Sequence, residues 1–342
     1  MHNSHQLRPI GDFSLFTQLA WTRKALAIFL GVSRKALVKA QKILLAERFE
    51  DEIMVRGIPT RIIFNYGFFS FTKKIKNKRR EILAPHPDVQ KIFRALGDKL
   101  YKPSRIHKKA FGFVKKRSIL LAAKSLLGNR HFFSFDIASA FPSITEEMVR
   151  KTLQRLRIET YLIDPLVWIV THYYNQERRL PQGSSCSPVL MNLVYRPMCD
   201  EIERVCKAAG IDWFVYADDF HFAAENVSPE IKAKLLAIPP RYGFSIKKEK
   251  THDNLGKTIP HLLGLTIIDE KIHLKRKTKK KFRQLLYCAC QNESSISPKK
   301  INGIIASIRQ VYGPEKNWPG WLLKDWLKYQ QHIGGNYAKN IN

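Results

Sequence analysis

The segment FVYADDF at residues 214–220 constrains the fold most, because it places two adjacent aspartates, Asp218 and Asp219, inside an apolar run. A carboxylate among Phe, Val and Tyr side chains is costly unless solvent or a partner compensates its charge. Two apolar strands that meet at a tight turn would meet this requirement, since the turn is exposed while the aromatic side chains stay in the core. We therefore predict a β-hairpin with both carboxylates at its tip.

A third aspartate, Asp136, comes near the end of the short apolar strand HFFSFDI at residues 131–137. If this strand is an antiparallel neighbour of the hairpin, Asp136 lies beside Asp218. Carboxylates within about 4–5 Å of one another repel strongly unless cations lie between them. Mg²⁺ suits such oxygen ligands when substrate phosphates supply the rest, and two ions about 3.5–4 Å apart would assist an in-line phosphoryl displacement. An Asp-Asp pair alone is usually a turn former, so this prediction depends on Asp136.

The charge balance indicates the class of partner. The chain of 342 residues has 59 Lys and Arg against 29 Asp and Glu, a net charge of +30. Such an excess opposes a compact state unless a polyanion shares the surface. Because the cations cluster among aromatic residues, nucleic acid is the expected partner.

A membrane partner is the weaker alternative. No apolar run approaches the roughly 18 residues that span a bilayer, and the start of the chain lacks the layout of a signal peptide. The five cysteines form no CxxC pair and their number is odd, which argues against a zinc site or a disulfide framework. Reduced thiols in a cytoplasmic protein are therefore expected.

Several motifs, taken in order, resemble the successive palm motifs of reverse transcriptases. They are FDIASAF (135–141), PQGSSCSP (181–188), FVYADDF (214–220), GFSIKKEKT (243–251) and HLLGLTI (261–267). AFGFVKKRSI (110–119) followed by FPSIT (141–145) is similar to prokaryotic members of the family, namely those of retrons, group II introns and related phage-defence systems. The resemblance covers residues from about 60 to 310. It implies an α+β right-hand polymerase fold with an antiparallel palm sheet.

The resemblance also implies a division into domains. The expected parts are an N-terminal helical extension (1–57), fingers (58–130), a palm (131–272) with a fingers insertion around 146–180, a helical thumb (273–333) and a flexible tail (334–342). Within the extension, LAIFLGVSRKALVKAQKIL has the pattern of a helix-turn-helix. It is either a direct nucleic-acid contact or a helical layer packed on the larger domain.

Local signals predict where individual elements begin. Ser143 and Glu146 form a capping box for a helix that reaches about residue 157, and Asp164 with Pro165 opens another helix. Two strands are expected around a basic loop within residues 58–83, and a second hairpin at about 260–275. Further helices are expected at 13–46, 87–100, 187–210, 276–291, 297–311 and 319–332.

Residue roles follow from the resemblance. It implies that Asp136 and Asp218 ligate two Mg²⁺ ions, for which Mn²⁺ could substitute, and that Asp219 is a weaker ligand or lies just outside the ligand set. Phe141 matches a steric gate that rejects the ribose 2′-OH, although a core phenylalanine is the simpler interpretation. Gln182 and Gly183 match a loop that lies against the incoming nucleotide, where glycine allows close backbone approach.

Four further sets of residues would contact the substrates. Arg79 and Arg80 would clamp the triphosphate or contact a backbone phosphate. Lys250 matches a lysine near the nucleotide phosphates, a general acid for pyrophosphate or one of many solvated lysines. The primer grip would be Leu262, Leu263 and Gly264. Contacts to duplex phosphates, made without reading bases, are expected from Lys115, Lys116, Arg117, Lys275, Arg276, Lys277, Lys279, Lys280 and Lys281.

The implied function is RNA-directed DNA polymerisation on a structured noncoding RNA that serves as template and in some systems as primer. The partners would then be this RNA, dNTPs, the RNA–DNA hybrid product and an effector protein, with no membrane. Ala122–Leu126 stands where retron enzymes usually carry Asn-Ala-x-x-His, and Leu262-Leu263-Gly264 stands where they carry Val-Thr-Gly. The alternatives are therefore a divergent retron enzyme and another defence-associated reverse transcriptase.

Two other functions remain open on the sequence alone. One is a polymerase with the same palm that makes RNA or untemplated DNA; Phe141 argues against RNA as the product. The other is a nonenzymatic nucleic-acid-binding protein that uses the helix-turn-helix-like segment and the basic surface. A protein that binds RNA but extends no annealed primer would favour the latter.

Overall fold

The computed structural model describes residues 20–55, 57–75, 78–174, 177–254, 261–290 and 297–339. These residues form two compact units that interleave along the chain. The first unit takes its described residues from the stretch up to Phe113, from Ile137–Val205 and from Lys234–Lys247, and the second from Val114–Asp136, Cys206–Ala233 and Lys248 onwards. All strand pairs in the named sheets are antiparallel, as the α+β fold class requires.

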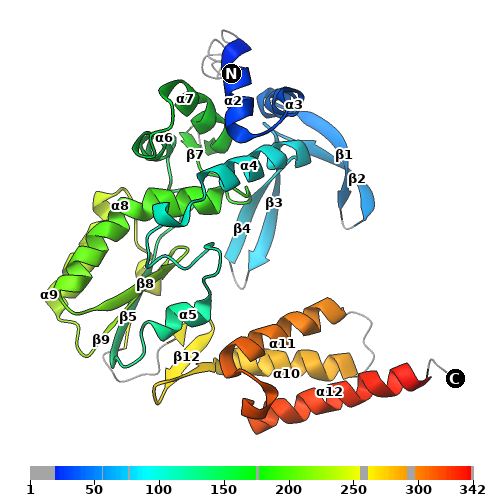
Figure 1. Cartoon of the computed structure of the whole chain (residues 1–342), viewed down its shortest axis with the longest axis vertical. Helices are drawn as coiled ribbons and strands as arrows, with labels where there is room; N and C mark the ends of the chain where they lie inside the picture. The colour runs from blue at the N-terminus through cyan, green and yellow to red at the C-terminus, as the bar shows by residue number, and fades with distance from the viewer. Residues whose placement is uncertain are drawn as a thin grey trace, which may run out of the picture. The chain divides into compact units, whose positions relative to one another are not determined.

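The first unit combines helices with short hairpins (Figure 1). Its elements are α2 (Ala20–Leu30), α3 (Arg34–Leu45), β1 (Phe49–Val55), β2 (Ile58–Phe64), β3 (Phe68–Ile75), β4 (Lys78–Pro85), α4 (Pro87–Leu100), η1 (Pro103–Arg105), α6 (Glu146–Arg155), α7 (Thr160–Val170), β6 (His172–Tyr174), β7 (Glu177–Arg179), most of α8 (Ser187–Ala208) and the later part of α9 (Pro229–Arg241).

Residues 20–55 are only partly helical, which corrects the predicted helical extension over 1–57 for its described part. Ser33 caps α3 by accepting a hydrogen bond from the Ala36 N–H, and Gly31 makes the turn before it with a φ of 68°. The two helices expected from the helix-turn-helix pattern are thus present. After Leu45 the alternation of FEDEIMV favours a strand, and β1 pairs with β2 from Phe49↔Phe64 to Val55↔Ile58.

Two helix starts differ from the prediction. The cap of α6 is Thr145, whose side chain accepts from the Met148 N–H, whereas the Ser143 hydroxyl donates to the Ala140 carbonyl instead. α7 begins at Thr160, so Pro165 lies inside the helix and Asp164 forms an ion pair with Arg150 instead of a cap. Leu162 and Ile163 are buried on this extra turn, and that burial favours helix before the proline.

The second unit is built on a four-stranded sheet in the order β10-β5-β9-β8 (Figure 1). Its elements are α5 (Ile119–Lys124), β5 (His131–Asp136), β8 (Asp212–Tyr216), β9 (Asp219–Ala224), η2 (Lys248–Lys250), β10 (His252–Asp253), β11 (His261–Leu262), β12 (Leu265–Ile268), β13 (Lys271–Leu274), α10 (Arg276–Cys290), α11 (Pro298–Tyr312), η3 (Glu315–Asn317) and α12 (Gly320–Lys339).

Helices α10, α11 and α12 end the chain as the helical bundle that was expected of a thumb (Figure 1). Arg283 on α10 pairs with Asp325 on α12 at 2.9 Å, and the Tyr312 hydroxyl of α11 accepts from the Leu274 N–H at 3.2 Å. α12 continues through Gly334 and Gly335 to Lys339, beyond the predicted end of the helical part at 333, and residues 340–342 lie outside the described residues. A glycine weakens a helix only by about 1 kcal/mol, which the rest of α12 outweighs.

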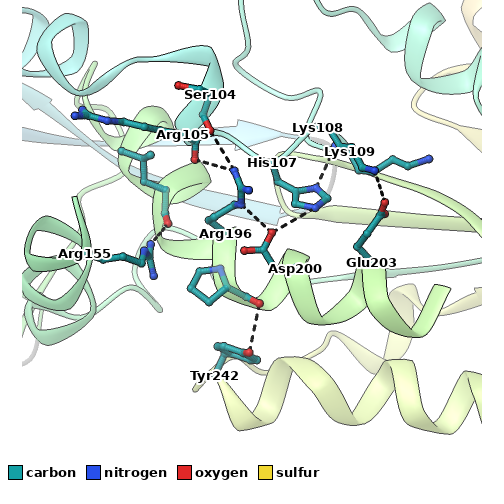
Figure 2. A network of polar contacts seen from close by, with 12 residues as sticks. Ser104, Arg105, His107, Lys108, Lys109, Arg155, Arg196, Asp200, Glu203 and Tyr242 are labelled. Carbon is teal, nitrogen blue, oxygen red and sulfur yellow. Dashed lines mark hydrogen bonds and ion pairs between the residues drawn. The ribbon is translucent and has the colours of Figure 1, made fainter. Parts of the chain in front are cut away.

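A polar network ties the loop after α4 to α8 within the first unit (Figure 2). Arg196 pairs with Asp200 at 2.8 Å and donates to the carbonyls of Ser104 and Arg105, each at 3.4 Å. Lys108 pairs with Glu203 at 2.7 Å. Since α8 begins at Ser187, within the PQGSSCSP motif (181–188), these contacts fix the helix into which this motif leads.

His107 is the titratable centre of this network. Lys109 N–H donates to His107 Nδ1 at 3.1 Å, and His107 Nε2 lies 3.6 Å from Asp200 Oδ1 (Figure 2). Burial lowers the pKa of His107 from 6.5 to about 4, with Asp200 opposing the shift. Because the folded pKa lies below the unfolded value, this histidine favours folding fully above about pH 6.5, and the contribution is lost as the pH falls toward 4.

We predict that the free energy of unfolding of the native protein falls more steeply on acidification than that of His107→Asn, whose amide oxygen can still accept from Lys109. Between about pH 7.5 and pH 5 the difference should be on the order of 1 kcal/mol, after allowance for partial solvent access. Urea unfolding at both pH values measures it. Burial likewise lowers the pKa of His172 to about 4, but His172 is present in both proteins and cancels. Equal slopes would contradict the assignment.

Candidate active site

The candidate site is set by the register between β5 and β9. Asp136 is paired directly with Asp219, and Asp219 is also paired with Tyr216 of β8. Residues directly opposite one another in an antiparallel pair project from the same face of a sheet. Asp136 and Asp219 therefore share one face at one end of the sheet. The sequence led us to expect an antiparallel neighbour with Asp218 beside Asp136; the strands are neighbours, but the residue paired with Asp136 is Asp219. Asp136 is only 5% exposed.

Asp218 lies in the turn that joins the two strands of the hairpin. The turn consists of Ala217 and Asp218, and Ala217 has a φ of 60°. Glycine is usual where the first central residue of a two-residue hairpin has positive φ, so alanine here stores backbone strain. Asp218 and Asp219 are both partly exposed, which confirms the prediction that a hairpin tip frees these carboxylates from the core.

The opposite face of the same strands is aromatic. The Phe133 and Phe222 rings stack with centroids 4.4 Å apart, and those of Phe135 and Phe220 stack at 5.0 Å. Trp213 of β8 stacks alongside them, 6.2 Å from Phe222. Period-two alternation thus places Phe133, Phe135, Phe220 and Phe222 on one face of the sheet. Asp136 and Asp219 lie on the other face, together with Phe214 and Tyr216 of β8. The apolar burial on the first face offsets the cost of holding Asp136 in a buried strand.

The donor set fits divalent cations that also bind substrate. In the described part of the chain, no group of three or more His, Cys, Asp and Glu side chains closes around a single point. The three aspartates offer only oxygen, and they lie at one end of the sheet, on the central strands β5 and β9 and in the turn before β9. Mg²⁺ usually binds through one or two carboxylates and completes its shell with water and substrate phosphates, so an open carboxylate cluster suits it.

Arg79 and Arg80 lie on β4 in an unusual electrostatic setting. The register pairs Lys74 with Arg79 and Lys73 with Arg80, and all these side chains are exposed. Like charges directly opposite one another destabilise a strand pair. A bound anion would relieve this repulsion, which makes the β3–β4 hairpin suited to a phosphate group.

Gly183 is required by a protein contact. Its φ is 137°, and a Cβ there would lie 2.3 Å from the Leu83 carbonyl oxygen of β4. The neighbouring Gln182 carbonyl accepts a hydrogen bond from the Leu83 N–H at 2.9 Å. The backbone at Gly183 is therefore closely approached, as the glycine indicated. In this structure the approaching group is the backbone of β4, whereas the sequence analysis expected the incoming nucleotide.

A family model described as reverse transcriptase (RNA-dependent DNA polymerase) matches residues 71–267, more than half of the 342-residue chain. The chain belongs to the reverse transcriptase family. It is accordingly an RNA-directed DNA polymerase, and its fold is the right-hand polymerase fold that the sequence motifs implied. The β5–β9–β8 sheet with its aspartates lies inside the matched region.

Similar proteins have been characterised in bacteria. The Retron Ec86 reverse transcriptase of Escherichia coli is 28% identical over 241 residues, which covers 68% of this chain and 73% of that protein. The Retron Mx65 reverse transcriptase of Myxococcus xanthus is 24% identical over 297 residues, which covers 78% of this chain and 69% of that protein. A solved telomerase of Candida albicans superposes with a TM-score of 0.48 and 12% identity, and the match spans 78% of this chain and 56% of that one.

One aromatic residue of the reverse transcriptase escaped the sequence argument. Phe113 is 48% exposed, has a φ of 60°, and its ring centroid lies 6.4 Å from that of the half-buried Phe141. Asn192 anchors the loop by donating to the Gly112 carbonyl at 2.9 Å. An exposed aromatic in a strained loop is costly without a ligand, so Phe113 joins the candidate substrate-binding residues. The signal in the sequence was its place in AFGFVKKRSI.

The remaining predicted residues fall in the second unit. Leu263 and Gly264 form the turn between β11 and β12 with φ values of 54° and 93°, and Leu262 is buried. Gly264 accepts from the Lys275 N–H at 2.9 Å, which links this turn to the start of α10. Lys250 ends η2, and its side chain lies outside the described residues.

The predicted phosphate-contacting cations lie at the surface of the second unit. Exposed members are Lys115, Lys116, Arg276, Lys277, Lys280 and Lys281, and half-buried members are Arg117, Lys275 and Lys279. Residues 115–117 come from the loop before α5, and residues 275–281 come from the start of α10. Their roles, like those of the other predicted site residues, stay predictions at this point.

We predict that Gly183→Ala lowers the free energy of unfolding by at least about 1 kcal/mol more than Gly128→Ala does, because it adds a clash to the backbone strain. Gly128 has a φ of 82°, but a Cβ added there would meet only open space, so the control carries strain alone. Urea unfolding of the two variants gives the comparison. Equal losses would show that β4 moves away freely and that the contact with Leu83 is not restrictive.

Proposed function

We propose that the protein copies a structured noncoding RNA into DNA by nucleotidyl transfer at two divalent ions held by Asp136, Asp218 and Asp219. The observation that supports this most is the register of β5 and β9, which sets Asp136 opposite Asp219 beside the turn that contains Asp218. Two ions bound there would stabilise the attacking and leaving oxygens of the in-line displacement. Mg²⁺ is the proposed physiological ion, and Mn²⁺ would substitute for it.

The three aspartates differ in what they contribute. Asp136 is buried in a central strand, so its carboxylate is held rigidly and supplies a fixed ligand. Asp218 follows the strained Ala217 in the turn, where its carboxylate is accessible to substrate. Asp219 begins β9 and provides the third, weaker position. A rigid ligand next to accessible ones suits ions that must also accept the triphosphate of each new nucleotide.

Nucleotide selection is proposed for residues of the first unit. Arg79 and Arg80, crowded by opposing lysines, would bind the triphosphate, and Gln182 would lie against the nucleotide. Phe141 would exclude the ribose 2′-OH, which accounts for DNA as the product. The basic residues before α5 and at the start of α10 would contact phosphates of the RNA–DNA hybrid, Lys250 would protonate pyrophosphate, and residues 262–264 would steady the primer end.

The biological setting is proposed from the relatives. Both bacterial proteins described above carry retron names, and retron-type copying of a dedicated RNA is therefore proposed for this chain, in antiphage defence and with an effector protein. We place the activity in the cytoplasm, where thiols stay reduced; within the described residues the cysteines form no disulfide. None of the described helices is both long and apolar enough to cross a membrane.

Primer extension on an annealed RNA template with dNTPs and Mg²⁺ tests the proposal. The native protein should extend the primer, and Asp136→Asn should lower the rate by at least about 100-fold, beyond the 10- to 100-fold that loss of a neighbour of a metal ligand costs. Asp212→Asn is the matched control, because Asp212 lies on the same face at the far end of β8. A native protein that binds RNA without extension would overturn the polymerase function, and an active Asp136→Asn would overturn the site.

The sugar gate has its own test. Phe141→Ala should raise incorporation of ribonucleotides relative to deoxynucleotides by at least about 10-fold, because the ring no longer fills the space of the 2′-OH. Tyr287→Ala, which removes an exposed aromatic ring of α10 outside the proposed site, should leave this ratio unchanged. Single-nucleotide extension with matched rNTP and dNTP pairs measures it. An unchanged ratio in Phe141→Ala would reduce Phe141 to a packing residue.

A further inference from the structure

His221 is a buried histidine beside the proposed metal site. It follows Asp219 by two positions on β9, so both side chains project from the same face of the sheet. Its side chain is 4% exposed, and its Nε2 atom lies 3.2 Å from Asp219 Oδ1. None of the sequence motifs assigns a role to this position.

The Nε2 atom is short of a hydrogen bond despite this distance. It has no hydrogen-bond partner among the described residues, so its alignment with Asp219 falls outside hydrogen-bond geometry. His131, which lies on β5 of the same sheet, is satisfied at both ring nitrogens: Nδ1 accepts from the Val227 N–H at 3.0 Å, and Nε2 faces Asp253 Oδ1 at 2.7 Å. A buried polar group without a partner costs about 1–3 kcal/mol, so the His221 geometry needs a reason.

Packing accounts for the ring but not for its polar tip. The imidazole ring contacts Phe214 of β8 with centroids 4.8 Å apart, as a core aromatic side chain would. Phe214 and His221 are directly paired across the strands, and Ser134 of β5 is paired with His221 from the other side. The ring is thus held by both neighbouring strands, and the direction of Nε2 toward Asp219 follows from that position. An apolar residue would fill the same space without an orphaned nitrogen.

We infer that His221 is a positioning residue that orients the Asp219 carboxylate. With its proton on Nε2, the imidazole donates to Oδ1 once the carboxylate rotates about its terminal torsion, which is soft and broad. Oδ1 is then occupied, and Oδ2 is left to face the ions. Asp219 accordingly acts through a single oxygen, in keeping with its weaker place in the ligand set. This inference rests on the proposed two-ion reaction.

A fixed donor behind a carboxylate ligand has a measurable effect on the ion. Groups that hydrogen-bond to metal ligands set ligand orientation, and their loss typically costs about 10- to 100-fold in metal affinity or activity. The effect should fall on metal affinity and on kcat, and spare the KM for the annealed primer and template, which His221 does not contact in this arrangement. A residue needed only for packing would lower the stability and leave the metal affinity of the folded protein unchanged.

The experiment compares His221→Gln, whose amide N–H can take the place of Nε2, with His221→Asn, whose shorter amide cannot reach, and with the apolar His221→Leu. Binding of Mn²⁺ alone is followed by electron paramagnetic resonance, and Mg²⁺ dependence by primer extension. We expect His221→Asn and His221→Leu to weaken Mn²⁺ binding by about 10-fold or more and to raise the Mg²⁺ requirement similarly, while His221→Gln stays within about 3-fold of the native protein.

The controls separate orientation from packing. Leu286→Ala, at a fully buried position of α10, is a packing control that should lower the unfolding temperature without altering Mn²⁺ affinity. Asp219→Asn removes the acceptor, so adding His221→Asn to it should cause no further loss of Mn²⁺ affinity if the histidine acts through Asp219. Similar Mn²⁺ affinities for His221→Gln and His221→Asn would overturn the inference. Additive losses of Mn²⁺ affinity in the double variant His221→Asn with Asp219→Asn would overturn it as well. That comparison does not depend on the apolar variant folding.

The outcome for His221 is distinguishable from that for the reaction itself. If the native protein fails to extend a primer, the proposed function fails, whatever the variants show. If the native protein extends and all three His221 variants match it in Mn²⁺ affinity and Mg²⁺ requirement, only the role of His221 fails.

Discussion

The antiparallel pairing of β5 with β9 is the interaction on which the candidate active site depends. Its register sets Asp136 opposite Asp219, and the same register stacks Phe133 on Phe222 and Phe135 on Phe220 on the other face. A slip by one residue would exchange the two faces, burying carboxylates among phenylalanines. The apolar face therefore enforces the position of the acidic face. Aromatic packing, which takes no part in the chemistry, determines where the carboxylates meet.

Charge repulsion is the second constraint. It acts among the carboxylates near the ends of β5 and β9 and among the opposed cations of β3 and β4. Neighbouring carboxylates at the tip of β8 and β9 repel one another without cations, and opposed cations on β3 and β4 repel one another without anions. In the proposed reaction, divalent ions would supply the missing positive charge and the phosphates of the nucleotide and the nucleic acid the missing negative charge. With a net charge of +30, the protein leaves this compensation to its ligands on a larger scale as well.

The sequence predicted the parts of the fold that rest on short-range patterns. Strand HFFSFD and helix Pro87–Leu100 follow from apolar runs and from a proline at the helix start, and both occur as expected. The start of α7 was misplaced because tertiary burial of Leu162 and Ile163 extends the helix upstream of Pro165. β1 was missed because its weak alternation becomes a strand only when β2 pairs with it. In the site, the grouping of Asp136 with the Asp218-Asp219 turn followed from spacing and resemblance. The strain at Phe113 and the missing hydrogen bond of His221 Nε2 depend on tertiary structure, so the sequence could not show them.

Strained turns in this protein carry side chains where glycine would relieve the strain. Ala217 and Leu263 each adopt positive φ, in the turns before Asp218 and at the predicted primer grip. Each costs about 1–2 kcal/mol relative to a relaxed backbone. A glycine would remove that cost but would let the turn sample many more conformations. In the two hairpins, strand pairing on both sides of a residue with restricted backbone conformation therefore holds the tip in place. In the proposed reaction these tips would position phosphates to within a fraction of an ångström, for which a rigid backbone is suited. The strain at Ala217 and the orienting role inferred for His221 then serve the same end, since one limits the backbone of the Asp218 turn and the other limits the carboxylate of Asp219.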